Sequence, residues 1–292
     1  MTRPDEPSAT PTVAVAIPCY NEAAAVGAVV DQFRAAWPSA EIVVIDNNST
    51  DGTGEIAARH GARVVSEPKQ GKGFAVRAAF KDLRGRDVVV MVDGDGTYPA
   101  EFIGELIAPI LEGRAETTVG ARRPEPGAGA MSPVRALGNL IIRSAFRLLI
   151  GPGSGDLLSG YRAFSRRFVE TVPLRSEGFE IETELAVATV ARRLPAVEIT
   201  VPYHPRIAGT ESKLRAFRDG RKILTTILRE GLRLSSRRVF GLYVVAAAIV
   251  CGPLIWFPTT RFLGLALAAI GLAGLLVAKV RQTRALRRET VI

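Results

Sequence analysis

The chain has 292 residues, 47% of them hydrophobic, and carries a formal net charge of +9 at pH 7. This apolar content is enough for a substantial core, and two cysteines exclude a small scaffold held together by disulfides. The positive charge falls mostly in the second half of the chain, which predicts an anionic membrane surface or phosphate-bearing substrates as partners. Nucleic acid is not predicted, because its binding would need aromatic side chains interleaved with the basic ones.

The first half of the chain alternates between two kinds of segment. Residues 1–11 are polar and proline-rich, so we expect a disordered lead-in rather than a signal peptide. Short apolar, β-branched runs then follow at 13–17, 42–45 and 88–92, with segments of helical composition between them. Strands that alternate with helices predict an α/β fold, in which a mostly parallel sheet is flanked by helices.

Polar residues follow each of these predicted strands. In a parallel sheet, ligands bind at the carboxyl ends of the strands, so these residues are expected to converge on one site. The three clusters are Asn21 with Glu22, Asp46 with Asn48, and Asp93 with Asp95.

The stretch "VVVMVDGDGTYP", residues 88–99, places two aspartates one residue apart after a buried strand. Alternate residues of an extended segment point the same way, so Asp93 and Asp95 are expected to share one focus. Two carboxylates held together repel each other unless a cation lies between them, and the residues that follow supply none. This pattern favours a bound divalent cation. The alternative is an ordinary Asp-Gly turn with solvated acids.

Three later segments of the chain bear on membrane contact. Residues 134–150 form a predicted helix with Arg135 and other arginines set into it, typical either of the membrane interface or of a surface helix packed on a core. Residues 239–257 and 262–278 carry no charge, and each approaches the length needed to cross a bilayer. We therefore predict a transmembrane hairpin, the alternative being a buried helical pair in a soluble domain.

Arginine and lysine flank the two predicted spans, while the turn between them holds only Arg261. The positive-inside rule then predicts an integral protein of the cytoplasmic membrane, with the main domain and both termini in the cytoplasm. The expected domains are residues 12–210, basic interfacial helices at 211–238, the hairpin at 239–279 and a basic tail at 280–292. Small residues in the second span, Gly264, Gly271 and Gly274, suit packing in a homo-oligomer.

Six motifs occur in a fixed order along the chain: "IPCYNE", "DNNSTDGT", "GKGFAVRAAF", "DGDGTYP", "DLLSGYRAFSRR" and "GTESKL". Together they resemble the family 2 glycosyltransferases of GT-A fold, and more narrowly the dolichol- or polyprenyl-phosphate sugar synthases, over about residues 13–214. The resemblance implies a metal-dependent hexosyltransferase. Such an enzyme moves a sugar, with inversion, from a UDP or GDP donor to a polyprenyl phosphate.

The resemblance also assigns residues to the donor. It implies that Asp93 and Asp95 hold Mg²⁺ or Mn²⁺ against the diphosphate. It places the nucleotide sugar among residues of the strand ends and the glycine-rich turns: Pro18, Tyr20, Asn21, Glu22, Asp46, Asn48, Lys72, Asp93 and Gly94. Asp46 is alternatively a helix N-cap or a turn former. Lys72 has no Walker frame around it, and is either a phosphate or ribose contact or a solvated lysine.

A lipid phosphate acceptor is already ionised near neutral pH, so it needs cations rather than a base. The residues predicted to bind its phosphate are Arg122, Arg135, Asn139 and Ser212, and arginine suits this role because its planar fork binds phosphate at two points. The residues predicted to act in catalysis are Asp95, Asp156, Arg206 and Lys213. For each arginine the alternative is an exposed charge or a membrane-surface contact.

The segment "GFEIETEL" departs from simpler relatives in carrying Glu180, Glu182 and Glu184. On a helix Glu180 and Glu184 share a face. One alternative function is therefore transfer to a lipid or polysaccharide hydroxyl with a glutamate base. A second is a non-catalytic membrane scaffold that binds nucleotide sugars.

Overall fold

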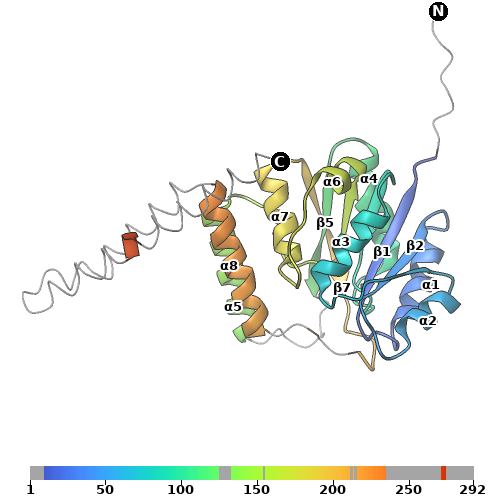
Figure 1. Cartoon of the computed structure of the whole chain (residues 1–292). Helices are drawn as coiled ribbons and strands as arrows, with labels where there is room; N and C mark the ends of the chain where they lie inside the picture. Colours follow the sequence, from blue (N-terminus) through green and yellow to red (C-terminus); the bar gives the residue numbers. More distant parts are fainter. Residues whose placement is uncertain are drawn as a thin grey trace, which may run out of the picture. The chain divides into compact units, whose positions relative to one another are not determined.

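The computed structural model describes residues 10–124, 133–153, 155–210, 213, 216–234 and 271–273. The chain divides into two compact units, Met1–Arg143 with Pro152–Ile223, and Ser144–Gly151 with Leu224–Ile292. The first unit holds the sheet and all the strands of the described residues (Figure 1).

A seven-stranded sheet runs through the described part of the chain in the order β3-β2-β1-β4-β6-β5-β7. Its strands β1, β2, β3 and β4 are parallel to one another, β6 is antiparallel to both of its neighbours, and β5 is parallel to β7. The prediction of a mostly parallel sheet is therefore confirmed, with one reversed strand inside it. The strands are β1 (Val13–Cys19), β2 (Glu41–Asp46), β3 (Arg63–Ser66), β4 (Val88–Met91), β5 (Thr117–Pro124), β6 (Arg162–Ser165) and β7 (Ala196–Tyr203).

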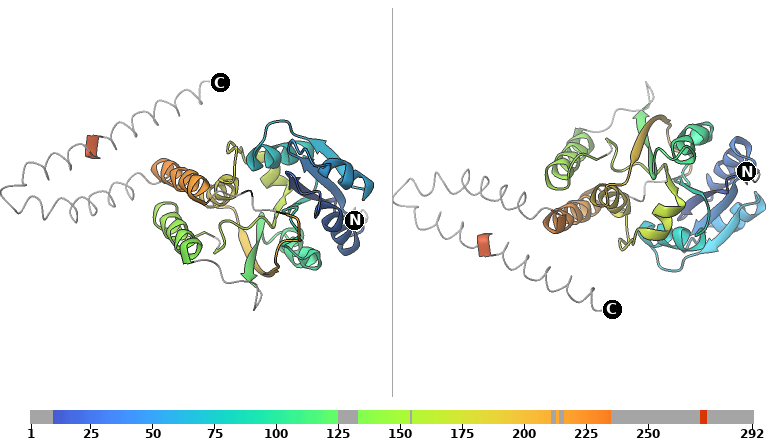
Figure 2. Two further views of the ribbon diagram at one scale, coloured as in Figure 1. Left: turned by 90° about the horizontal axis from the view of Figure 1, so that it is seen from below. Right: turned by 90° about the horizontal axis from the view of Figure 1, so that it is seen from above.

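Helices cover both faces of this sheet (Figure 2). One face packs against α1, α2 and α4, and the other against α3, α6 and α7. The helices are α1 (Val26–Ala36), α2 (Thr53–Arg59), α3 (Lys72–Asp82), the 3₁₀ turn η1 (Ala100–Phe102), α4 (Ile103–Leu111), α5 (Pro133–Leu149), α6 (Arg166–Thr171), α7 (Ile181–Ala191) and α8 (Ala216–Leu234).

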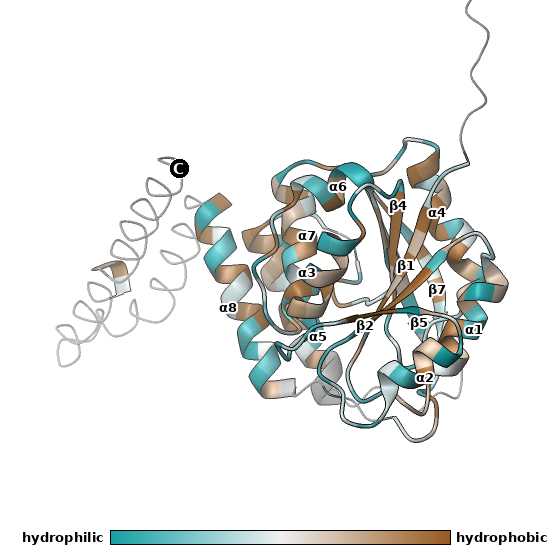
Figure 3. Ribbon diagram, turned by 45° about the vertical axis from the view of Figure 1, so that its right-hand side comes forward, coloured by the Kyte–Doolittle hydropathy of each residue, from teal (hydrophilic) through white to brown (hydrophobic). Residues whose placement is uncertain are grey.

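The two central strands explain why the sheet is layered on both sides. Every residue of β4, and nearly every residue of β1, is buried, so these strands show no alternation between apolar and polar residues. Odd residues of β1 such as Val15 pack toward α1, and even ones such as Ala16 pack toward α3. Strands buried on both faces read as continuous apolar runs, which is what made them recognisable in the sequence (Figure 3).

The helix predicted at 134–150 is confirmed as α5, which leaves Leu137, Leu140, Ile141 and Leu148 exposed. Both predicted membrane spans, at 239–257 and 262–278, lie almost entirely outside the described residues and stay predictions. Within the described ranges, no helix has both the length and the apolar character that a bilayer crossing requires.

Candidate functional site

The three polar clusters do converge at the carboxyl ends of the parallel strands. Cys19 at the end of β1 is in register with Asp46 at the end of β2, and Ala16 of β1 is in register with Met91 at the end of β4. The chain segments that leave these strands therefore emerge side by side at one edge of the sheet. This confirms the expectation drawn from the strand ends.

Two glycines fix the position of the acidic pair. A Cβ added at Gly160 would lie 2.2 Å from Asp93 Oδ2, so this glycine leaves room for the carboxylate. A Cβ added at Gly94 would lie 2.4 Å from Cys19 Sγ, so the turn between the two acids packs directly on the end of β1. Any larger side chain at either position would push Asp93 or the turn out of place.

Asp93 is paired with a lysine of the chain itself. Lys72, the first residue of α3, places its Nζ 2.5 Å from Asp93 Oδ1 and 2.5 Å from Glu182 Oε1 of α7. Burial alone would lower the pKa of Lys72, but the two carboxylates outweigh it and raise that pKa. The lysine is thus a buried ammonium that bridges two acids, and its interpretation as a solvated side chain is wrong.

Asp95 has a cation of its own. Its Oδ2 lies 2.6 Å from Arg206 Nη1, and its Oδ1 accepts hydrogen bonds from the backbone and hydroxyl of Thr97 at 3.1 and 2.7 Å. Burial and the nearby charge of Asp93 nevertheless raise the pKa of Asp95. The residues that follow the two acids supply no cation, as the sequence indicated, but Lys72 and Arg206, which are distant in sequence, lie beside them.

Glu22 is buried beside this pair, at 7% exposure, and its Oε2 has no hydrogen-bond partner among the described residues. Burial, followed by the negative charge of Asp95, raises the pKa of Glu22 to about 7, although Lys213 and Arg206 act in the opposite direction. Four acids, Glu22, Asp93, Asp95 and Glu182, and three cations thus gather within one small region. Lys213 and Arg206, both predicted from the sequence, lie close enough to Glu22 to act against the rise in its pKa.

The loops that follow β1 and β2 are tied to each other by side chain to backbone hydrogen bonds. Asn21 accepts from the Thr50 backbone N–H at 2.8 Å, and the Asn21 N–H donates to Ser49 Oγ at 3.0 Å. Asp46 Oδ1 accepts from the Ser49 N–H at 3.2 Å, so Asp46 forms a turn and is not the cap of α2, whose N-cap is Gly52. Asn21 and Asn48 both adopt positive φ, 52° and 64°, which asparagine tolerates better than most residues.

Asn47 was missed as a structural residue of the site. Its Nδ2 donates to the carbonyls of Glu67 and Lys69, at 3.1 and 2.7 Å, and its Oδ1 accepts from the Gly71 N–H at 2.7 Å. One side chain therefore fixes the whole loop that leads into α3 and Lys72. The only sequence signal was its position between two residues that were singled out.

A second ion pair joins two of the predicted residues. Arg122 on β5 donates from Nε and Nη2 to the two carboxylate oxygens of Asp156, at 2.7 and 2.8 Å, and its guanidinium lies 5.4 Å from the centre of the Tyr203 ring. Burial would raise the pKa of Asp156, but the hydrogen bonds from Arg122 hold it below its usual range. The same loop continues to Gly160, whose N–H donates to the Tyr98 hydroxyl at 2.9 Å.

The remaining predicted residues are less fully described. Pro18 and Tyr20 are half-buried at the end of β1, and Asn139 is half-buried on α5. Arg135 belongs to α5, but its side chain lies outside the described residues, as does all of Ser212.

The glutamates of the "GFEIETEL" segment have separate partners. Glu184 accepts from the backbone N–H groups of Arg175 and Ser176, and Glu180 accepts from that of Gly178. Only Glu182 reaches the acidic site, through Lys72.

The family model for glycosyl transferase family 2 matches residues 14–172. Among curated proteins, "Glycosyltransferase AglJ" of Haloferax volcanii is 38% identical over 229 residues, which are 78% of this chain and 75% of that protein. This chain belongs to glycosyl transferase family 2.

Two further relatives of this glycosyltransferase have names that specify a substrate. "Dolichyl-phosphate hexose transferase" of Haloferax volcanii is 34% identical over 76% of this chain and 96% of that protein. "Polyprenol monophosphomannose synthase" of Mycolicibacterium smegmatis is 30% identical over 67% of this chain and 78% of that protein.

Solved structures support the mixed α/β fold expected of the family. A mycobacterial protein is superposed with a TM-score of 0.64 at 26% identity, over 76% of this chain and 75% of that chain. Glucosyl-3-phosphoglycerate synthase of Mycobacterium tuberculosis, solved with Mn²⁺, UDP-glucose and phosphoglyceric acid, has a TM-score of 0.59 at 24% identity, over 77% of this chain and 80% of that chain. This second likeness bears on the fold alone.

Proposed function

We propose that this glycosyltransferase moves a sugar from a UDP or GDP donor to a polyprenyl phosphate, at the cytoplasmic face of a membrane. The observation that carries the proposal is the cluster of Asp93 and Asp95 with Lys72, Arg206 and Lys213 at the strand ends. Acids that are able to hold a metal ion, surrounded by cations that are able to hold phosphate, suit a diphosphate leaving group. The names of two relatives supply the class of acceptor.

Asp93 and Asp95 are the residues that would hold Mg²⁺ or Mn²⁺. Carboxylate oxygens are suitable ligands for both ions, and Asp93 Oδ2 has no hydrogen-bond or ion-pair partner among the described residues. The described residues contain no group of three or more acidic, histidine or cysteine side chains that would hold an ion unaided, so its other ligands would be diphosphate oxygens and water. The ion would supply Lewis-acid stabilisation of the departing diphosphate.

Arg122 remains able to bind an acceptor phosphate while it is paired with Asp156. A guanidinium has five N–H donors, and the pair uses Nε and Nη2, which leaves Nη1 without a partner among the described residues. The carboxylate holds the guanidinium plane in one orientation, next to the ring of Tyr203. We assign the acceptor phosphate to this arginine together with Arg135, Asn139 and Ser212.

The membrane part of the proposal comes from the sequence of residues 239–279 and its arginine-rich flanks. The exposed leucine and isoleucine side chains of α5 would face the lipid interface, and exposed Phe217 and Leu228 of α8 would do the same. A polyprenyl acceptor cannot leave the bilayer, so an enzyme anchored beside it has access to it at all times.

The alternative of a hydroxyl acceptor activated by a glutamate base is less well supported. Glu182 is bound to the ammonium of Lys72, and Glu184 accepts hydrogen bonds from two backbone N–H groups. Burial raises the pKa of Glu182, but its carboxylate is already engaged by the ammonium of Lys72, so it could accept a proton from a hydroxyl only if that ion pair were broken.

The test supplies radiolabelled UDP- and GDP-sugars to membranes that contain the full chain, and then extracts the lipid. We expect label in a mild-acid-labile lipid, lost on chelation of divalent metal and lost in Asp93→Asn, with Gly138→Ala as an active control. Label in an acid-stable lipid would support the hydroxyl acceptor instead. Donor binding without any transfer would support the non-catalytic scaffold.

A further inference from the structure

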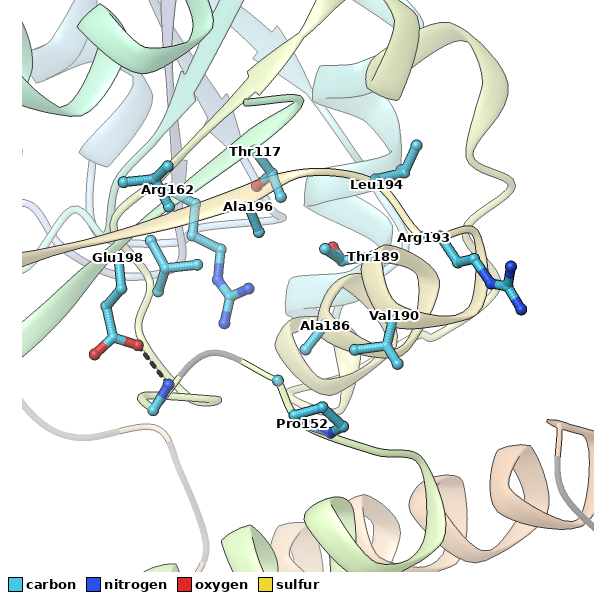
Figure 4. A pocket seen from close by; sticks show the side chains of 14 residues that line it. Thr117, Pro152, Arg162, Ala186, Thr189, Val190, Arg193, Leu194, Ala196 and Glu198 are labelled. Carbon is cyan, nitrogen blue, oxygen red and sulfur yellow. Dashed lines mark hydrogen bonds between the residues drawn. The ribbon is translucent and has the colours of Figure 1, made fainter. Parts of the chain in front are cut away.

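A cavity of about 530 Å³ lies away from the acidic site, between α7 and the strands β5, β6 and β7 (Figure 4). It arises because the core under α3, α6 and α7 includes residues of β1, β2, β4 and β6 but none of β5 or β7. The end of the sheet is therefore only partly covered on this face, by α7 and the loop around Pro152 and Gly155. Its volume falls in the range of small-molecule sites, about 300–1,000 Å³.

Most of the wall of this cavity is apolar. Its apolar lining residues are Val119 of β5, Val190 of α7, Leu194 between α7 and β7, Val197 of β7, and Pro152. The exposed residues Arg193 and Glu198 also line it, which opens it to solvent. Glu198 accepts a hydrogen bond from the Gly155 N–H.

A buried arginine lines the same cavity. Arg162 is 2% exposed, and donates from Nε to the Ser159 carbonyl at 2.9 Å and from Nη2 to the Leu157 carbonyl at 2.8 Å. Its remaining nitrogen, Nη1, has no partner among the described residues, and no carboxylate there forms an ion pair with it. The two acids that act on it from a distance, Glu182 and Asp156, are paired with other cations.

Thr117 provides a second, independent observation. It is 2% exposed, lines the cavity, and its hydroxyl has no hydrogen-bond partner among the described residues. Its neighbour Thr118 points to the opposite face, where its hydroxyl donates to the Leu106 carbonyl at 2.6 Å. A buried charge without a counter-ion and a buried hydroxyl without a partner are both costly, and both belong to residues that line this cavity.

We propose that this cavity binds an amphiphile with an anionic head, a carboxylate or a phosphate monoester, on an apolar body. The head pairs with the guanidinium of Arg162, and the body packs against Val119, Val190 and Leu194. Arg193 and Glu198 at the opening carry opposite charges, so the preference for an anion over a neutral ligand comes from Arg162. Ligand in this site would rest against the loop that holds Asp156, because Arg162 is fastened to that loop.

The test titrates the purified full chain, in nanodiscs of neutral lipid, with octanoate or octyl phosphate below their micelle concentrations. Calorimetry is expected to show saturable 1:1 binding of at least one of these probes, beyond the partitioning measured with empty nanodiscs. Octanol and inorganic phosphate, which supply only the chain or only the charge, are expected to bind at least about tenfold more weakly. Equal binding of octanol, or no binding of either anionic probe, would overturn the proposal.

Three variants locate the binding. Val190→Trp fills the cavity and is expected to abolish binding, whereas Thr117→Val removes one hydrogen bond and is expected to weaken it about three- to tenfold. The matched control is Thr118→Val, on the opposite face of the same strand, which is expected to leave the affinity unchanged. Binding that survives both Val190→Trp and Thr117→Val would occur elsewhere and would refute the assignment. Because the readout is binding, it does not depend on the proposed sugar transfer.

Discussion

The carboxylate of Asp93 lies against the Cα of Gly160, and this contact yields a test at a single atom. Gly160→Ala adds a Cβ that would lie 2.2 Å from Asp93 Oδ2, so the carboxylate has to move. We expect sugar transfer to fall by about a hundredfold, as is usual for a displacement of about 1 Å among reacting groups. The rate of sugar transfer from the nucleotide-sugar donor, compared between Gly160→Ala and the parent chain, measures this effect.

The control for that substitution is Gly138→Ala on α5, where an added Cβ meets nothing within 4 Å. Both variants should retain the secondary structure of the parent, as measured by circular dichroism. Full activity of Gly160→Ala would show that the position of Asp93 is not important for transfer.

The pair of Arg122 and Asp156 yields a prediction of pH dependence. The folded-state pKa of Asp156 lies below its ordinary value of 3.8, so the stability that the pair contributes is present above pH 3.8 and is lost as the pH falls through the folded-state pKa. Asp156→Asn should lower the free energy of unfolding by about 2 kcal/mol at neutral pH, since it leaves a mostly buried guanidinium without its acid.

Urea unfolding of both proteins between neutral and acid pH measures this difference. It should stay constant from pH 7 to about pH 5 and shrink below that. A difference that grows on acidification would contradict the assignment.

At the scale of elements, the loop between β3 and α3 depends on one side chain. Asn47→Ala removes hydrogen bonds to Glu67, Lys69 and Gly71, and leaves three part-buried backbone groups without this partner. We expect the free energy of unfolding to fall by about 2 kcal/mol and the KM for the donor to rise, because Lys72 directly follows this loop. Ser39→Ala, at an exposed turn, is the control and should change neither quantity.

The elements differ in how much of them could be predicted. The strands β1, β2 and β4 were recognisable because they are apolar runs that end in polar residues, and the same logic predicted where Asp46, Asp93 and Asp95 would meet. The outer part of the sheet was not predicted from the sequence. Exposed and part-buried residues alternate along the edge strand β7, and β6 is antiparallel to both of its neighbours. Ion pairs such as that of Lys72 with Glu182 join different helices, and no local sequence pattern predicts them.

At the scale of the whole molecule, the proposed membrane hairpin yields a test of how the chain is attached to a membrane. If residues 239–279 span the bilayer, the full chain should stay in the membrane pellet after both high-salt and alkaline carbonate washes. An interfacial attachment through arginine alone would be released by salt, because such contacts are screened. Immunoblotting of the washed fractions distinguishes the two, and release by either wash would contradict the spanning hairpin.

The ammonium of Lys72 and the guanidinium of Arg206 are counter-ions supplied by the chain itself, and they influence how the site binds metal ions and phosphates. A divalent ion held by Asp93 and Asp95 would lie close to both cations and be repelled by them, whereas the oxygens of a bound diphosphate would give the two cations partners of their own. Mn²⁺ and UDP or GDP are therefore expected to tighten each other's Kd by an equal factor, as reciprocity of linked equilibria demands. Titrating each solute with and without the other measures that factor. A factor of one would mean that the two cations do not weaken the binding of metal in the absence of the diphosphate.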